Sequence, residues 1–275
     1  MRSKTIAFIG CGNMARCLIA GLVKDGYPPA QLRAADPLPA QLRYLSERCP
    51  VKTFADNHQA VSDARVVVLA VKPQVMREVA VDLAPSLEHE RPLVLSIAAG
   101  ITCSALKRWL GEDCTVVRAM PNTPALVGSG ASALYADPAV PAAEREAAES
   151  ILRAVGLTVW VGEEGLLDVV TAVSGSGPAY FFLLIELMEK VAVELGLTRE
   201  CARLLTLQTA FGAAKMVLES SADAATLRAQ VTSPGGTTER AIQCLQDAGM
   251  EESVRQAIAA AARRSTELAK LFGEV

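Results

Sequence analysis

The chain has 275 residues, of which 51% are hydrophobic and 21% are charged, a composition typical of a soluble folded protein with a sizeable core. Its formal charge of −3 gives no basic field for a nucleic acid or an anionic membrane, so the composition favours small-molecule chemistry with neither partner. The seven cysteines are scattered and form no C-x-x-C pair, which indicates free thiols and a cytoplasmic location.

The chain begins with a predicted strand and helix joined by a glycine turn. The apolar run 6–9 leads into Gly10-Cys11-Gly12-Asn13-Met14-Ala15, and apolar residues then recur at helical spacing to residue 24. In a dinucleotide-binding turn, Gly10 makes the tight turn, Gly12 lets the backbone approach a pyrophosphate, and the small Ala15 permits close packing. The pyrophosphate would lie at the helix N-terminus. A purely structural glycine turn would show the same short pattern.

The next segments continue the alternation of strand and helix. A strand over 31–35 ends at Asp36, which lies 24 residues after Gly12. This is close to the spacing of about 20 residues at which an acidic residue binds the adenosine ribose in dinucleotide-binding proteins. Helices are predicted over 38–48, 103–110 and 141–155, and strands over 51–54, 65–71, 92–98, 114–120 and 157–161. This alternation predicts an α/β fold with a doubly wound parallel sheet.

The C-terminal part has a different pattern. Helical periodicity extends over 178–195, 199–219 and 253–271, and no strand is predicted after residue 166. The sequence therefore predicts a nucleotide-binding domain over 1–163 and an all-helical domain over 164–275. The most apolar late stretch, 180–188, contains Glu186 and is too short for a transmembrane span, so none is predicted.

Unusual sequences follow three of the predicted strands, at the edge where parallel sheets bind ligands. They are Val71-Lys72-Pro73-Gln74, Ser96-Ile97-Ala98-Ala99-Gly100 and Met120-Pro121-Asn122-Thr123-Pro124. Lys72 suits an anionic group of a cofactor or substrate, but a solvated surface lysine is an equal alternative.

Two more unusual stretches lie in the helical part. The segment Ser174-Gly175-Ser176-Gly177-Pro178 favours close helix packing at its glycines over a direct part in catalysis. The segment Ser233-Pro234-Gly235-Gly236-Thr237-Thr238 opens directly into a helix, and its backbone N–H groups and hydroxyls predict an anion cradle. A simple helix cap is the alternative.

Several catalytic groups are absent from the expected places. The two histidines, His58 and His89, do not lie where an acid catalyst is expected, and Tyr180 is followed four residues later by Leu184, not by a lysine. No histidine, cysteine or carboxylate cluster has metal-ligand spacing, so no metal site is predicted. An imine substrate fits this pattern, because its nitrogen can be protonated before hydride arrives and the protein need only orient it.

The chain resembles the pyrroline-5-carboxylate reductase family over essentially its whole length. The segments that carry the resemblance are the turn 8–14, the stretches 70–73, 96–100 and 118–124, and the two glycine-rich segments 174–180 and 233–238. The resemblance implies a Rossmann domain, a helical dimerisation domain and reduction of pyrroline-5-carboxylate to L-proline, the last step of proline synthesis. It also implies a homodimer, often assembled into a decamer in the family.

The resemblance further implies roles for individual residues. Thr238 matches a threonine whose hydroxyl approaches the ring nitrogen and is the predicted catalytic residue. The predicted substrate-binding residues are Glu164, Ser233, Gly235, Gly236, Thr237 and Thr238. The predicted cofactor-binding residues are Gly10, Cys11, Gly12, Asn13, Met14, Asp36, Asn57, Val71, Lys72, Pro73, Ala98 and Ala99.

The cofactor and the chemistry leave alternatives at this stage. The family generally prefers NADPH, but Asp36 would repel a 2′-phosphate and accept a hydrogen bond from the 2′-hydroxyl of NADH, so both cofactors stay open. A β-hydroxyacid dehydrogenase shares the overall layout, but Phe181 stands where that family has a catalytic lysine. A non-catalytic NADP sensor would leave the cradle at 233–238 without a purpose.

Overall fold

The computed structural model describes residues 4–273 and groups them into two compact units. One unit comprises residues up to 176 together with those from 260 onward, and the other comprises 177–259. The long C-terminal helix α12 (Met250–Gly273) contributes residues to both. The two units begin and end at other residues than the predicted domains 1–163 and 164–275. The domain boundary after residue 163 stays a prediction.

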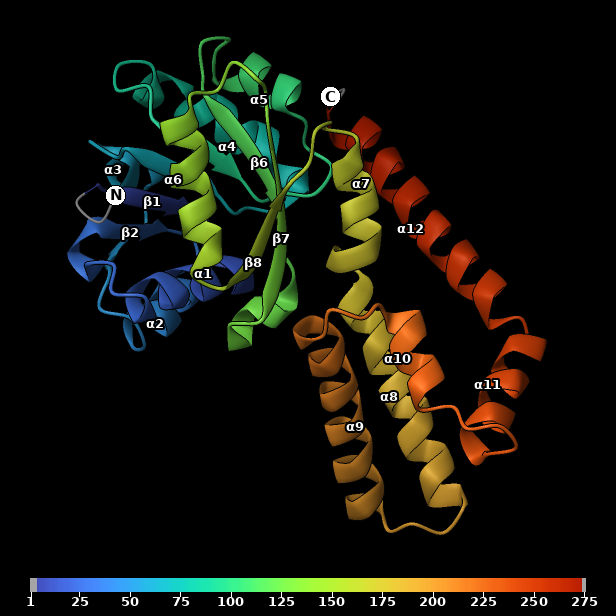
Figure 1. The fold of residues 1–275 in the computed structure, drawn as a ribbon. Helices are drawn as coiled ribbons and strands as arrows, with labels where there is room; N and C mark the ends of the chain where they lie inside the picture. The colour runs from blue at the N-terminus through green and yellow to red at the C-terminus, as the bar shows by residue number, and fades with distance from the viewer. Residues whose placement is uncertain (1–3, 274–275) are drawn as a thin grey trace. The chain divides into compact units, whose positions relative to one another are not determined.

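The first unit is built on one sheet of eight strands, ordered β3-β2-β1-β4-β5-β6-β7-β8 (Figure 1). All neighbours are parallel except β6 and β7. The strands are β1 (Ile6–Ile9), β2 (Leu32–Ala35), β3 (Lys52–Phe54), β4 (Val66–Leu69), β5 (Leu93–Ser96), β6 (Val116–Met120), β7 (Gly130–Ala136) and β8 (Gly156–Trp160). The doubly wound, predominantly parallel sheet predicted from the sequence is confirmed.

Helices cover both faces of this sheet, as the alternation of side chains along β1 requires. Ile6 and Phe8 join the core beneath α1 and α6, whereas Ala7 and Ile9 join the core beneath α3, α4 and α5 (Figure 1). These helices are α1 (Asn13–Lys24), α3 (Asn57–Val61), α4 (Pro73–Leu87), α5 (Cys103–Leu110) and α6 (Ala142–Arg153), and α2 (Pro39–Ser46) leads into β3. The turn η1 (Pro29–Gln31) precedes β2.

The strand β7 was not expected from the sequence. Its residues, GASALYA, contain no continuous run of large apolar side chains. It pairs antiparallel with β6 after a short connection that contains the 3₁₀ turn η2 (Thr123–Val127). A connection this short permits antiparallel pairing, whereas parallel pairing needs a longer crossover. The crossover helix α6 then brings β8 parallel to β7.

A short helical segment follows β8 and ends just before α8 (Gly177–Glu194). It consists of α7 (Leu166–Val170) and the π-helical turn η3 (Thr171–Gly175). Gly100, with φ of +75°, lies so close to α12 that an added Cβ would be 3.2 Å from the Ala269 nitrogen. The C-terminal end of α12 therefore packs against the loop after β5.

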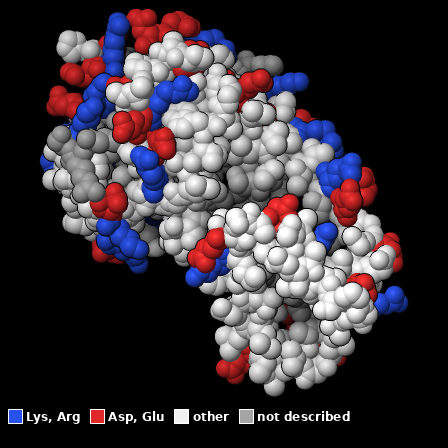
Figure 2. Space-filling view, in the orientation of Figure 1, with Lys and Arg blue, Asp and Glu red and all other residues white. Residues whose placement is uncertain are grey.

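The second unit is entirely helical within its described residues, in agreement with the sequence. It contains α8 (Gly177–Glu194), α9 (Arg199–Glu219), α10 (Ala224–Gln230), α11 (Thr237–Asp247) and the beginning of α12. Large apolar side chains lie on its surface, among them Phe181, Phe182 and Phe211, each more than 60% exposed. Figure 2 shows few charged side chains on the visible face of this unit. A surface of this kind is typical of a subunit interface.

Candidate cofactor and substrate sites

The glycine turn leaves an open helix N-terminus at the carboxyl end of β1. Gly10 has φ of +95°, and an added Cβ would lie 2.8 Å from the Ala70 oxygen, so only glycine fits there. Gly12 is the N-cap of α1 and gives no side-chain cap, and a Cβ added to it would meet nothing within 4 Å. The first turn of α1 also carries no acidic residue. Its N–H groups are therefore available to an anion, and the turn fits a pyrophosphate.

Asp36 supports this turn from the end of β2. Its carboxylate accepts hydrogen bonds from the Cys11 N–H at 2.8 Å and from the Leu38 N–H at 2.9 Å. Asp36 is only 9% exposed, so its negative charge is fixed beside the turn. Burial, together with the Asp36 charge, raises the pKa of the Cys11 thiol to about 12, so this thiol stays protonated and unreactive at neutral pH.

The other predicted cofactor residues lie along the same edge of the sheet. Asn57 begins α3 after β3, and Lys72 is the N-cap of α4 with Pro73 as its first residue. Ala98 follows β5, and its N–H approaches the Ser96 hydroxyl at 3.4 Å. The sheet therefore brings the predicted cofactor residues to one edge. None of these positions is shown to bind a ligand, and their roles stay predictions.

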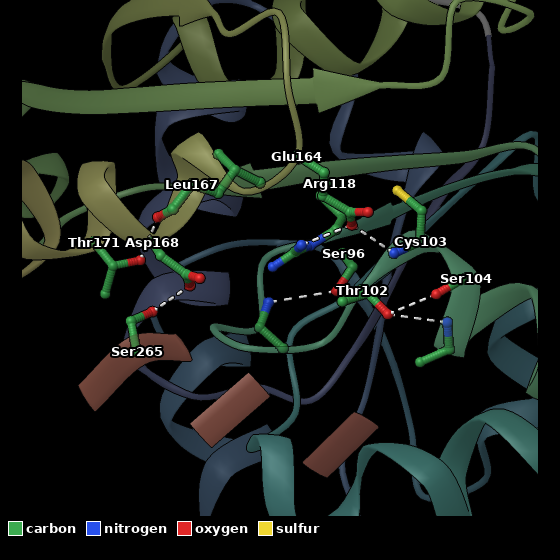
Figure 3. Close-up of polar contacts among 12 residues, drawn as sticks. Ser96, Thr102, Cys103, Ser104, Arg118, Glu164, Leu167, Asp168, Thr171 and Ser265 are labelled. Carbon is green, nitrogen blue, oxygen red and sulfur yellow. Dashed lines mark hydrogen bonds and ion pairs between the residues drawn. The ribbon is translucent and has the colours of Figure 1, made fainter. Parts of the chain in front are cut away.

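Glu164 precedes α7 and lies in a polar cluster with Arg118 of β6 and Cys103 of α5 (Figure 3). Its Oε1 atom accepts hydrogen bonds from Arg118 Nη1 and from the Cys103 N–H, both at 2.7 Å. The Arg118 side chain is 7% exposed and that of Glu164 is 25% exposed. The carboxylate thus neutralises a buried guanidinium and caps the start of α5. No local sequence pattern indicates this pairing, because the two residues are 46 positions apart.

A second carboxylate in Figure 3, Asp168, joins α7 to α12. It accepts hydrogen bonds from the Ser265 hydroxyl at 2.7 Å and from the Thr266 hydroxyl at 2.9 Å. Sequence reasoning did not single out this contact, which links residues 97 and 98 positions apart. Together with Glu164, it fixes α7 within the first unit.

The predicted substrate cradle lies in the second unit. Gly235 adopts φ of +71°, and Gly236 is the N-cap of α11. The Gly236 N–H donates to the Ser233 carbonyl at 3.0 Å, and the Gly235 N–H donates to the Glu239 carboxylate at 2.7 Å. Thr237 and Thr238 occupy the first turn of α11, where N–H groups have no intrahelical acceptor. The loop therefore presents the threonine amides to an anion more readily than the glycine amides.

Among the described residues, no group of three or more His, Cys, Asp or Glu side chains could hold a metal ion. One helical stretch, Leu166–Glu194, is long and apolar enough to cross a membrane by length and composition alone. This is weak evidence for a membrane span, since a helix covered by a partner subunit passes the same test.

The open turn at the carboxyl edge of a doubly wound sheet defines a Rossmann-type dinucleotide-binding protein. Residues 5–100 match the family model described as NADP oxidoreductase coenzyme F420-dependent, which places the chain among the nicotinamide-dependent oxidoreductases. Residues 164–268 match the model for pyrroline-5-carboxylate reductase dimerisation.

Comparison with individual proteins narrows the class. The chain is 53% identical over 274 residues to a pyrroline-5-carboxylate reductase of Pseudomonas aeruginosa, with all of both chains covered. A solved pyrroline-5-carboxylate reductase from Coxiella burnetii is 45% identical with a TM-score of 0.91, covering 96% of this chain and 98% of that one. A Plasmodium falciparum pyrroline carboxylate reductase with NADP bound is 28% identical with a TM-score of 0.87, covering 98% and 99%. The chain belongs to the pyrroline-5-carboxylate reductase family.

The Arg118–Glu164 pair generates a stability prediction. Glu164→Gln should lower the free energy of unfolding by about 2 kcal/mol, because it leaves the buried guanidinium without its anion while keeping an acceptor for the Cys103 N–H. Urea unfolding measures the change. The neighbouring Glu163→Gln is the matched control, because Glu163 is exposed, and it should alter stability by less than about 0.5 kcal/mol. Equal stability of the two variants would contradict the structural role of Glu164.

Proposed function

We propose that the chain reduces L-1-pyrroline-5-carboxylate to L-proline with NADPH or NADH, as the last step of proline biosynthesis. The observation that carries the proposal is the full-length 53% identity to a relative of that name. The open N-terminus of α1 supports it independently, since it suits the pyrophosphate of a nicotinamide cofactor. When bound, the reduced nicotinamide supplies the hydride that adds to the C=N carbon.

The protein's own contribution to this reaction is binding and orientation. A protonated imine already carries the positive charge that attracts hydride, so a strong acid side chain is unnecessary. The carboxylate of the substrate would bind at the N-terminus of α11, where the Thr237 and Thr238 amides lie beside the dipole of the helix. The Thr238 hydroxyl would then approach the ring nitrogen and stabilise its proton. Ser233, Gly235 and Gly236 shape this loop.

The direct test is consumption of NADPH in the presence of pyrroline-5-carboxylate, measured by absorbance. Thr238→Ala should lower kcat by about tenfold while changing the Kd for NADPH less than twofold, because the hydroxyl acts on the substrate. Thr238→Ser is the matched control and should retain most of kcat, because it keeps the hydroxyl. If Thr238→Ala turned over as fast as the wild type, Thr238 would have no catalytic role. A wild type without activity would refute the proposed reaction.

Cofactor choice depends on Asp36 in this proposal. The carboxylate is held beside the glycine turn by two backbone N–H groups and is largely buried. A 2′-phosphate at the end of β2 would meet this fixed negative charge, whereas a 2′-hydroxyl could donate to it. NADP remains a cofactor of the family, as the bound relative illustrates, and NADH is the alternative that Asp36 favours.

Replacement of Asp36 measures this preference. Asp36→Ser should raise the ratio of kcat/KM for NADPH to that for NADH by about tenfold, because the repulsive charge disappears. Asp36→Asn separates charge from shape, since it removes the charge and keeps an acceptor for one of the two N–H groups. Both variants should shift the ratio in the same direction. An unchanged ratio in both would remove Asp36 from cofactor selection.

We also propose that the chain works as a homodimer, and that such dimers can assemble into a decamer. The dimerisation model spans 164–268, and many large apolar side chains of this region are exposed in the single chain. A partner subunit would cover them, and would explain the apolar character of Leu166–Glu194 without a membrane. Sedimentation velocity should show dimers or decamers at micromolar concentration. A chain that stays monomeric under these conditions would contradict the proposal.

A further inference from the structure

The loop after β5 carries two of the predicted cofactor residues, Ala98 and Ala99. Pairing with β4 extends to the Ile97 N–H, which donates to the Leu69 carbonyl at 3.1 Å. Beyond it, the Ala98 N–H approaches the Ser96 hydroxyl at 3.4 Å, which is long for a hydrogen bond. The position of the two alanines therefore depends on what packs against the loop.

The backbone of α12 packs against this loop at Gly100. Gly100 is buried and has φ of +75°, a conformation that favours glycine. A Cβ added to it would lie 3.2 Å from the Ala269 nitrogen and 3.3 Å from the Ala269 Cα atom. Backbone atoms cannot rotate away as the end of a side chain can. Helix and loop are thus in direct backbone contact one residue after Ala99, and a shift of the helix end would release the loop.

The end of α12 is anchored on both sides of Ala269. One turn earlier, the Ser265 hydroxyl donates to the Asp168 carboxylate at 2.7 Å, and Ser265 is only 4% exposed (Figure 3). One turn later, the Gly273 carbonyl accepts a hydrogen bond from Arg108 Nη2 at 2.6 Å. The contact with the loop therefore lies between two polar ties.

Apolar packing follows the same face of the helix. Ser265, Ala269 and Phe272 recur at spacings of four and three residues, so they lie on one face of α12. Phe272 packs against the core cluster that contains Ile101 and Leu106. Ile101 directly follows Gly100, so this core contact supports the same loop from its C-terminal side.

We propose that the C-terminal end of α12, residues 265–273, supports the cofactor loop, and that Asp168 is a positioning residue that anchors this support. The helix end acts through Gly100 and holds the loop 97–101 in the position that receives the cofactor. Without the anchor, the loop populates other positions, and only molecules with the loop in place bind the cofactor. The inference rests on the proposed function, because it needs the predicted role of the two alanines. Every residue in it belongs to the first unit.

Loss of the anchor should weaken cofactor binding and leave the chemical step intact. The apparent Kd is the intrinsic Kd divided by the fraction of molecules competent to bind, so a fall of this fraction to about one tenth raises the Kd about tenfold. Saturating cofactor selects the competent loop, so kcat recovers. The factor should be the same for NADPH and NADH, because β1 and β4 separate β5 from the end of β2, where Asp36 lies.

Asp168→Ala is the test variant, because it removes the acceptor of both the Ser265 and the Thr266 hydroxyls. We expect the Kd for NADPH, measured without substrate by the fluorescence of the bound nicotinamide, to rise about tenfold, with kcat at saturating NADPH within about twofold of the wild type. Hydrogen exchange of peptides spanning 97–106 should be about tenfold faster in the free protein. Saturating NADPH should return it to the wild-type rate.

Gly100→Ala disturbs the same contact from the side of the loop, and serves if Asp168→Ala does not fold. Its Cβ would meet the backbone of Ala269, so the Kd for NADPH should rise in this variant as well. Both changes act on one loop. The Kd of the double variant should therefore rise by less than the product of the two single factors.

Glu149→Ala is the matched control. Glu149 accepts hydrogen bonds from Thr158 Oγ1 at 3.0 Å and from Trp160 Nε1 at 2.8 Å, so its replacement also removes one acceptor from two side chains of the first unit. It does not touch the loop or the end of α12. The Kd for NADPH and the exchange over 97–106 should stay within about twofold of the wild type, even where the melting temperature falls as far as in Asp168→Ala.

Three results would overturn the inference in a wild type that binds NADPH. They are an unchanged Kd in both Asp168→Ala and Gly100→Ala, an equal rise of the Kd in Glu149→Ala, and a kcat that stays low at saturating NADPH. The second would assign the effect to general destabilisation, and the third would assign it to the chemical step. A wild type that binds NADPH without reducing pyrroline-5-carboxylate would refute the proposed reaction alone, because the Kd values still decide the role of the helix end. A wild type that binds neither cofactor would refute both.

Discussion

Parallel pairing from β3 to β6 is the constraint on which the rest of the structure depends. It directs the carboxyl ends of these strands to one edge, so that residues distant in sequence share a surface. This pairing positions the glycine turn, Asp36, the start of α4 and the loop after β6. The Asp36 carboxylate adds a bond across the edge to the Cys11 N–H, which ties the end of β2 to the turn after β1.

The sequence predicted the periodic helices and strands well, and the contacts between residues distant in sequence poorly. The helices over 103–110 and 199–219 have the predicted bounds, because their apolar spacing and flanking residues are local signals. The strand β7 was missed because its small residues lack an apolar run. The partners of Glu164 and Asn122 could not be predicted, since each contact joins segments whose approach depends on the completed sheet. Glycine spacing located the turn, but not the use of Asp36 to support it.

The two units differ in how they bury their apolar side chains. The first buries its own core on both faces of the sheet. The second exposes large apolar side chains on α8 and α9 and has few buried residues of its own. Its folding free energy would therefore depend on protein concentration, as expected for a domain completed by a second copy. The proposed substrate loop belongs to this unit, so catalysis would depend on assembly as well.

Because Pro178 has no N–H, the effects of substitutions at two distant positions should be coupled. It leaves the Ser174 carbonyl dependent on an amide supplied 52 residues earlier in the chain, by Asn122. Substitutions at positions 122 and 178 should therefore be epistatic. An exchange of Pro178 for a residue with an N–H would offer Ser174 a local donor, which would relax the requirement for asparagine at position 122 and permit an ordinary α-helical turn. The two positions should therefore tolerate substitution jointly, although they lie far apart in the sequence.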